Sequence, residues 1–350
     1  MKDSFTCKFC GNQSGKSSVI IKEMLNGTNE EFGYYECEHC KSLQIKKIPE
    51  NLGQYYQQEY YSFNTMNKII KKVKFYLYEH YLYGNFIGKI LSKFIEDNKE
   101  LLIILSELLK DNRITENSRI LDIGCGNGDF LDDLANVGFK NLNGMEPYIE
   151  QDIQTESFTI FKNFLSDFYP KEKYDLIFLK DSLEHMDNPY DNLLKVKSLL
   201  SSNGAILISI PVKTEYFWDL YGVNWFQLDA PRHLIIPTLD GIKNLMNNLD
   251  LRIEKTIFNS IPYSFIISED YSNGKSMYSE GSFSSRNHFK NEFNKNFKKL
   301  DLKFMDKKVT FKQLNEYVKE LNKKQESEHA IFLIVNNEKY FFLNNYFKFF

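Results

Sequence analysis

The sequence lacks any long hydrophobic run, which excludes a membrane-spanning helix. A bilayer-crossing helix needs about 18 to 20 consecutive apolar residues, and no such stretch occurs. The first residues, Met1-Lys2-Asp3-Ser4, lead into no apolar segment, so no secretory signal is expected. We therefore expect a cytoplasmic location.

The sequence also lacks an excess of charge of either sign. It contains 44 Lys and Arg residues and 47 Asp and Glu residues, which gives a formal net charge of −3. Proteins whose main task is to bind nucleic acid gather Lys and Arg against phosphates, so this balance disfavours a nucleic-acid partner. The 350 residues, 42% hydrophobic and 26% charged, predict a soluble globular chain of two domains or one enlarged domain.

Cysteine is scarce, and four of the five cysteines form two C-x-x-C pairs, Cys7 with Cys10 and Cys37 with Cys40. In a reducing compartment such pairs suggest a metal before a disulfide. Two pairs can present four thiolates to one tetrahedral Zn²⁺ ion. We predict a structural zinc ribbon over residues 1–48, with free thiols or a redox pair as the alternatives. His39 could replace a cysteine but is expected to be a bystander.

After residue 48 the sequence predicts two further regions of different secondary structure. Residues 49–117 are expected to form a Tyr-rich and helical connecting segment. From residue 118 to 350, short buried strands alternate with helices, which predicts a mostly parallel sheet covered on both faces. Strands are expected at 119–123, 142–145, 158–161, 175–179, 205–210, 251–258 and 330–335. Helices are expected at 130–137, 189–200 and 239–249, with an insertion at about 260–329. The fold class is therefore α/β, Rossmann-like, with a seven-stranded sheet.

The most specific motif is a glycine-rich turn after the first expected strand. Gly124, Gly126 and Gly128 occupy alternate positions, with Cys125 between the first two and Asp122 two residues before them. Glycine allows a sharp turn and a close approach of the backbone to a ligand. Turns that bind dinucleotides usually read G-x-G-x-x-G, whereas this one reads G-x-G-x-G after an acidic residue. That acidic residue suits a ligand that carries positive charge.

This turn resembles the first motif of class I S-adenosylmethionine-dependent methyltransferases. Residues 174–189 and 199–211 resemble the region around the fourth strand of the same superfamily and the region after it. The resemblance implies S-adenosylmethionine as cofactor, bound at the carboxyl ends of the strands. Glu146, 24 residues after Asp122, would accept the ribose hydroxyls, and Asn163 with Phe164 would bind the adenine edge. Asp181 and Tyr61 would also line the cofactor site.

Two histidines follow expected strands and are candidates for a general base. His185 follows the fourth strand and His233 lies in the loop after the fifth. Histidine titrates near neutral pH and can accept a proton from the acceptor. Trp225 and Arg232 in the same loop are predicted to contact the substrate, although a structural salt bridge is an equal alternative for Arg232.

The ribbon, the Tyr-rich stretch and the loop at 225–233 resemble methyltransferases associated with sugar and surface-polysaccharide biosynthesis. The resemblance implies a small-molecule or sugar-type acceptor, methylated on oxygen, and no nucleic-acid partner. A homodimer is possible. Two other readings stay open, namely an NAD-dependent sugar-modifying enzyme and a non-catalytic interaction protein of the same fold.

Overall fold

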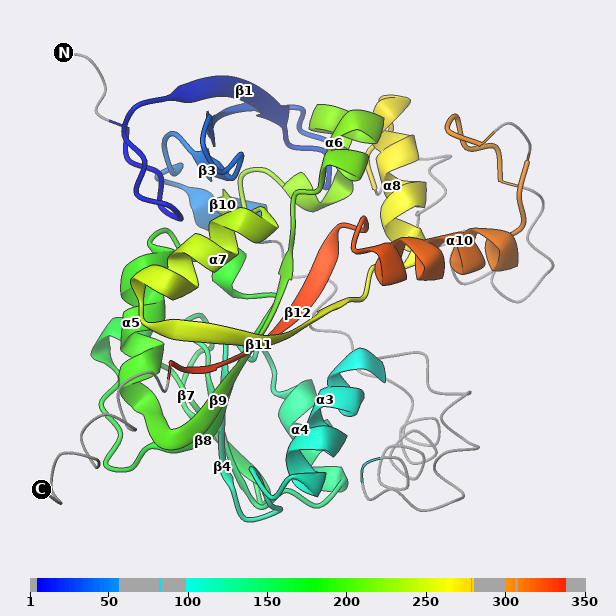
Figure 1. Cartoon of the computed structure of the whole chain (residues 1–350). Coiled ribbons are helices and arrows are strands. Elements are labelled where there is room, and N and C mark those ends of the chain that lie inside the picture. The colour runs from blue at the N-terminus through cyan, green and yellow to red at the C-terminus, as the bar shows by residue number, and fades with distance from the viewer. Residues whose placement is uncertain are drawn as a thin grey trace, which may run out of the picture.

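The computed structural model describes residues 5–56, 82, 99–277, 279, 300–305 and 308–337. Two sheets form its framework, a larger one at the centre and a smaller one formed mainly by the N-terminal residues (Figure 1). Tyr61 and most of the expected connecting segment at 49–117 lie outside the described residues.

The larger sheet has eight strands in the order β11-β12-β9-β8-β4-β5-β7-β6. In chain order they are β4 (Arg119–Ile123), β5 (Asn141–Met145), β6 (Ile153–Gln154), β7 (Phe158–Phe161), β8 (Tyr174–Lys180), β9 (Leu200–Pro211), β11 (Leu251–Phe258) and β12 (His329–Asn336). The five central strands are parallel, and β12 runs antiparallel to both β9 and β11. All seven expected strands are present, and β6 adds a short antiparallel edge.

The strand order places a switch point at the end of β4. The chain leaves β4 toward β5 and β7 on one side, then returns to pair β8 with the other side of β4. In open α/β sheets the ligand crevice lies outside the carboxyl ends of the strands at such a point. The glycine-rich turn therefore occupies the position that a ligand would use.

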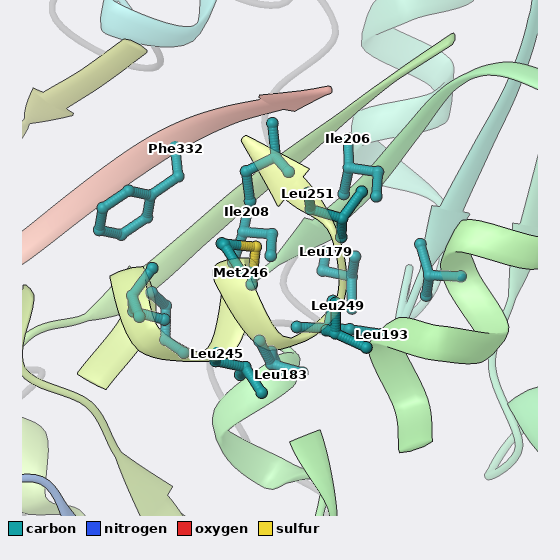
Figure 2. Packing of buried hydrophobic residues seen from close by; sticks show 14 of the residues in the cluster. Leu179, Leu183, Leu193, Ile206, Ile208, Leu245, Met246, Leu249, Leu251 and Phe332 are labelled. Atoms are coloured by element: carbon teal, nitrogen blue, oxygen red, sulfur yellow. The ribbon is translucent and has the colours of Figure 1, made fainter. Parts of the chain in front are cut away.

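Helices cover the two faces of the sheet, each over its own hydrophobic core. α3 (Lys99–Lys110) and α4 (Asp129–Asn136) supply side chains to one core, and α5 (Pro189–Leu199) and α7 (Leu239–Asn248) to the other (Figure 1). Figure 2 shows Leu245 and Met246 of α7 packed near Ile208 of β9 and Phe332 of β12. Apolar side chains on both sides of each central strand explain why these strands read as near-continuous hydrophobic runs.

The smaller sheet contains β1 (Lys16–Lys22), β2 (Glu31–Cys37), β3 (Leu43–Ile45) and β10 (Ile235–Ile236). β10 belongs to the later part of the chain and pairs with β3, Ile235 opposite Gln44. The N-terminal region also shares a core with the large sheet, since Phe9 and Cys40 pack in the same cluster as Ile242. The small sheet is thus joined to the later part of the chain by the β3–β10 pairing and by this shared core.

The described part of the expected insertion includes α8 (Pro262–Ser272) and α10 (Phe311–Lys324). α8 runs through Tyr271. α10 begins with a capping box in which Thr310 and Gln313 exchange side-chain and backbone hydrogen bonds. Together with α6 (Glu215–Tyr221) they enclose an aromatic core around Phe217, Trp225 and Phe265.

Short 3₁₀ helices occupy several connections: η1 (Leu52–Tyr55), η4 (Leu165–Asp167), η5 (Leu183–His185), η6 (Gly222–Asn224) and η7 (Phe226–Leu228). η5 and η7 matter most, because they carry or flank the two predicted catalytic histidines. Within the part of the chain that the structure describes, every helix is too short or too polar to cross a bilayer.

Candidate functional site

The glycine-rich turn joins β4 to α4 in a left-handed backbone. Gly124, Gly126 and Gly128 have φ of 77°, 55° and 83°, which other residues adopt only with strain. A Cβ atom on Gly124 would lie 2.6 Å from Cβ of Ser182, and one on Gly128 would lie 2.8 Å from Cδ1 of Ile160. A Cβ atom on Gly126 would meet nothing within 4 Å among the described residues. The outer glycines therefore serve packing, and Gly126 presents bare backbone to open space.

Glu146 follows β5 and reaches back to the turn. Its Oε2 accepts a hydrogen bond from the Gly126 backbone N–H at 3.2 Å, and its Oε1 accepts one from the Tyr148 N–H at 3.2 Å. Burial raises the pKa of Glu146, while these two N–H groups oppose the rise. A carboxylate is thus held beside the glycine turn, where the sequence predicted a ribose contact.

Asp122 lies within β4 and is almost fully buried. Its Oδ1 has no hydrogen-bond partner among the described residues. Burial raises the pKa of Asp122 to about 7, against the attraction of Lys180 and with a further rise from Glu146. A buried acidic group near neutrality at the end of a central strand is suited to a cationic ligand.

Asp181, the residue after β8, is occupied by contacts within the sheet. Its carboxylate accepts hydrogen bonds from Ser209 Oγ at 3.2 Å and from His329 Nε2 at 2.8 Å, and it lies 3.5 Å from Lys180 Nζ. Burial alone would raise the pKa of Asp181, but Lys180 and His329 outweigh it and lower that pKa. The predicted cofactor contact of Asp181 stays a prediction.

The predicted adenine side is open and aromatic. Phe164 is 54% exposed and Tyr148 is 83% exposed, and their rings meet edge to face at 6.2 Å. Asn163 is half-buried, and its amide donates a long 3.5 Å hydrogen bond to the Asp167 carbonyl. Cys125 is half-buried, and burial raises the pKa of its thiol. Tyr148 was not predicted; its place just after β5 was the available signal.

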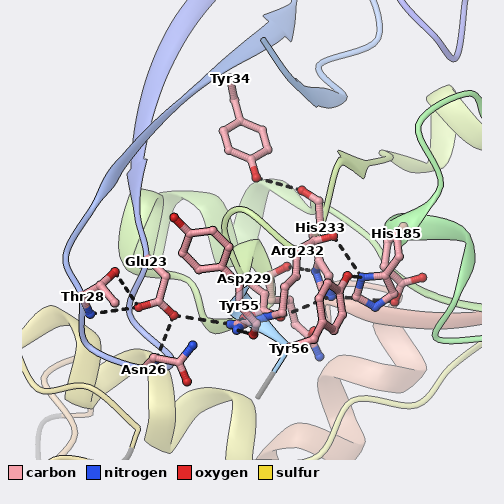
Figure 3. Close-up of polar contacts among 12 residues, drawn as sticks. Glu23, Asn26, Thr28, Tyr34, Tyr55, Tyr56, His185, Asp229, Arg232 and His233 are labelled. Carbon is pink, nitrogen blue, oxygen red and sulfur yellow. Dashed lines mark hydrogen bonds and ion pairs between the residues drawn. The ribbon is translucent and has the colours of Figure 1, made fainter. Parts of the chain in front are cut away.

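The two predicted catalytic histidines lie side by side although they are far apart in the sequence. The ring centroids of His185 and His233 are 4.8 Å apart. His185 Nδ1 lies 3.0 Å from both the Tyr56 hydroxyl and the Arg232 carbonyl, and His233 Nδ1 lies 2.7 Å from the Gln227 carbonyl (Figure 3). Burial lowers the pKa of both imidazoles, that of His185 to about 4. Both rings are therefore neutral at physiological pH.

Arg232 is fully buried beneath these histidines. Its guanidinium makes a bidentate pair with Asp229, lies 3.7 Å from Glu23 and donates to the Tyr55 carbonyl at 2.8 Å (Figure 3). Trp225 is also buried, and its indole N–H donates to Glu328 at 3.3 Å. These contacts correspond to the salt-bridge alternative for Arg232, and substrate contacts of Arg232 and Trp225 stay predictions.

The four paired cysteines meet in one cluster. Cys7 and Cys40 sulfurs are 3.6 Å apart, Cys10 and Cys37 sulfurs are 3.7 Å apart, and all four lie within 4.8 Å of one another. Within this cluster Cys10 is half-buried and the other three are buried. The arrangement is compatible with a tetrahedral metal ion, as the spacing predicted.

The sequence analysis missed three residues that lie around His185, His233 and Arg232. Glu184 precedes His185 in the sequence, and Tyr56 belongs to the Tyr-rich segment, so sequence position was a usable signal for both. Glu23 lies in a turn, where it accepts hydrogen bonds from the backbone N–H groups of Asn26 and Thr28. Nothing local marked Glu23, because its partner Arg232 is more than 200 residues away.

One family model and several solved structures are similar to this chain. Residues 92–256 match the family model described as a methyltransferase domain. A magnesium protoporphyrin IX methyltransferase from Synechocystis overlaps with a TM-score of 0.37 at 17% identity, covering 55% of this chain and 94% of that one. An S-adenosylmethionine-dependent methyltransferase from Clostridium acetobutylicum overlaps with a TM-score of 0.38 at 13% identity, covering 67% and 89%.

Curated relatives carry the name tRNA U34 carboxymethyltransferase. The protein from Campylobacter hominis is 30% identical over 132 residues, 34% of this chain and 45% of its own length. The protein from Methylococcus capsulatus is 27% identical over 103 residues, 26% of this chain and 31% of its own length. The chain thus spans less than half the length of these relatives.

These names overturn two expectations. A sugar-type or small-molecule acceptor in polysaccharide biosynthesis is wrong, because the relatives are named for action on tRNA. The expected absence of a nucleic-acid partner is contradicted by the same names. Net charge averages over the whole surface, so a balance near zero does not exclude a local site for phosphates.

The strand order with an antiparallel β12, the glycine turn at the switch point and the match over residues 92–256 agree with one another. The chain therefore contains an α/β domain with the Rossmann-like fold of class I S-adenosylmethionine-dependent methyltransferases.

Proposed function

We propose that the protein transfers a methyl or carboxymethyl group from an S-adenosylmethionine-type sulfonium donor to a nucleoside of tRNA. The observation that carries the donor half is the contact of Glu146 with the Gly126 N–H, at the switch point of the sheet and beside open space. The relatives' names support the acceptor half.

The described residues offer three kinds of contact to the donor. Glu146 would accept the ribose hydroxyls, because its carboxylate is already oriented by two backbone N–H groups. Asp122 would oppose the positive charge of the donor. The exposed rings of Phe164 and Tyr148 offer an apolar surface for adenine, with Asn163 at its edge.

Group transfer from a sulfonium is an in-line displacement. The acceptor atom forms a bond to the donated carbon, the carbon–sulfur bond breaks, and its electron pair remains on sulfur. The protein contributes chiefly by aligning the two reactants. The acceptor's proton must go to a base or to water. With its pKa lowered to about 4, His185 is a weak proton acceptor at neutral pH, and the base role of His185 and His233 stays a prediction.

An RNA acceptor needs cationic side chains near its phosphates. Sequence position alone offers one candidate region, since Lys68, Lys71, Lys72 and Lys74 follow closely upon one another. They lie outside the described residues. A tRNA acceptor would also agree with the expected cytoplasmic location.

The acceptor is tested by incubating the purified chain with tRNA and labelled donor, either S-adenosylmethionine or its carboxylated form. Digestion of the tRNA to nucleosides should give one labelled modified nucleoside. The label should disappear with Glu146→Ala and persist with Glu150→Ala, which changes an exposed carboxylate near the same strand. Unlabelled tRNA from a protein that still binds S-adenosylhomocysteine would reject the acceptor while sparing the donor site.

For the N-terminal cysteines we propose a structural zinc ion. Ligands about 2.3 Å from a tetrahedral centre lie about 3.7 Å apart, and the closest sulfur pairs lie at 3.6 and 3.7 Å. Cys7, Cys10, Cys37 and Cys40 would fill all four positions, leaving none for chemistry. Zinc content of the purified chain should fall by about one equivalent with Cys40→Ser. An unchanged content would contradict the ribbon assignment.

A further inference from the structure

Glu184, His185 and His233 form a second group of metal-ligand side chains, far from the cysteines in sequence. Glu184 and His185 come from η5 and His233 from the loop before β10. One ligand atom from each lies within 4.8 Å of those of the other two, and Glu184 Oε1 is 4.0 Å from His233 Nε2. We call these three residues the Glu-His-His cluster.

Backbone carbonyls orient both imidazoles of the cluster. A carbonyl oxygen can only accept, so the contact of His233 Nδ1 with the Gln227 carbonyl puts the proton on Nδ1 and leaves the Nε2 lone pair available. The contact of His185 Nδ1 with the Arg232 carbonyl does the same. Metal-binding histidines commonly donate their second N–H to a carbonyl or carboxylate in this way, which fixes the tautomer and the ring orientation.

Among the described residues around the cluster, buried carboxyl groups outnumber the guanidinium that pairs with them. Glu23, Asp229 and Glu184 are carboxylates exposed by 8% or less, and the guanidinium of Arg232 is the cation paired with the first two. Glu184 Oε2 has no hydrogen-bond partner among the described residues. Buried charges are normally paired or bound to a metal, because an isolated ion loses its hydration. A divalent cation would pair with the carboxyl group of Glu184, whose Oε2 atom has no hydrogen-bond partner among the described residues.

We propose that Glu184, His185 and His233 bind a divalent first-row transition metal ion. Two imidazoles and one carboxylate suit Zn²⁺, Fe²⁺ or Ni²⁺, whereas Mg²⁺ and Ca²⁺ prefer all-oxygen sites. Three protein ligands leave further positions open, unlike the closed set of four cysteines. In this assignment both histidines hold the ion and are not proton acceptors. The site does not depend on the proposed donor or acceptor.

The test counts and identifies metal in the purified full chain after dialysis against Zn²⁺ or Co²⁺. We expect about two equivalents of zinc per chain, one for each site. With Co²⁺, the cysteine site gives a thiolate-to-cobalt charge-transfer band, and the second site adds weaker d–d bands without one. Glu184→Gln and His233→Gln should each lose about one equivalent and keep the thiolate band. His39→Gln, which changes an exposed histidine on the ribbon, should keep both.

The count on the unmodified chain decides the proposal without any variant. One equivalent together with a complete thiolate band would overturn it. Two equivalents that survive in both Glu184→Gln and His233→Gln would place the second ion elsewhere and overturn it as well. Glu184→Gln keeps the shape of the side chain, so it covers the case in which His233→Gln disturbs the loop.

Discussion

The glycine-rich turn and the buried cluster around Arg232 show two ways of building a polar site. The turn is made of consecutive residues, and its central glycine faces open space. The cluster draws on separate segments near Glu23, Tyr55, His185 and Asp229, and Arg232 is completely covered (Figure 3). We therefore propose that the turn accommodates a ligand, while the cluster joins the small N-terminal sheet to the rest of the fold.

The largest expected effect comes from a substitution in the buried cluster around Arg232. Arg232→Met removes the guanidinium and leaves Asp229 and Glu23 buried without their partner. Stability should fall by about 3–5 kcal/mol, the usual cost of breaking a buried ion pair from one side. Urea unfolding followed by circular dichroism measures it. Arg252→Met, which changes a half-exposed arginine on β11, should stay within about 0.5 kcal/mol. Equal effects at the two positions would show that the cluster is not held by charge.

A second substitution removes the proposed ribose contact at the turn. Glu146→Ala should weaken binding of S-adenosylhomocysteine by about 100-fold, since hydrogen bonds to a charged group contribute about 1.5–3 kcal/mol each. Stability should change little, because among the described residues the carboxylate accepts hydrogen bonds from two backbone N–H groups. Isothermal titration calorimetry gives the affinity, with Glu150→Ala as the control. Unaltered affinity would remove Glu146 from the donor site.

The protonation state of Asp122 should make both donor affinity and stability depend on pH. Burial raises the pKa of Asp122 to about 7, so the group is neutral below that pH and negative above it. Affinity for a cationic donor should rise as pH increases through about 7, by at most tenfold per pH unit. Stability of the unliganded chain should fall over the range from about 4 to 7, because the folded state holds a proton that the unfolded state releases. Asp122→Asn should flatten both profiles, and a profile that keeps its slope would assign it to another group.

The smallest expected effect is a difference in stability between alanine variants of two of the three glycines. Gly126→Ala meets no neighbour, so only the strain of its left-handed backbone applies, about 1 kcal/mol. Gly128→Ala adds a clash with the side chains of Ile160 and Phe158 and should cost more. Thermal unfolding of the two variants gives the order. A larger loss at Gly126 would mean that its surroundings are not open.

The sequence was sufficient to predict the sheet and the turn because each depends on short stretches of consecutive residues. Buried strands of the parallel sheet read as apolar runs, and the glycines stand where a sharp turn follows β4. The four cysteines were equally clear, since each C-x-x-C pair is a local unit. Glu146 could be placed because the end of β5 is adjacent to the end of β4 in this topology.

The rest depends on pairings between distant segments. Arg232 carries no mark that distinguishes a buried partner of Glu23 from a substrate contact, because only the folded chain brings the two together. Asp181 follows a strand as a ligand residue would, yet His329 and Ser209 engage its carboxylate. The acceptor could not be inferred from net charge, because an average contains no information about where cations lie.

The central claim is that the turn at β4 binds the donor. The most direct measurement is calorimetric titration of the purified full chain with S-adenosylhomocysteine. The account predicts saturable binding in the micromolar range with one ligand per chain. Absence of binding by a chain that circular dichroism shows to be folded would contradict the account.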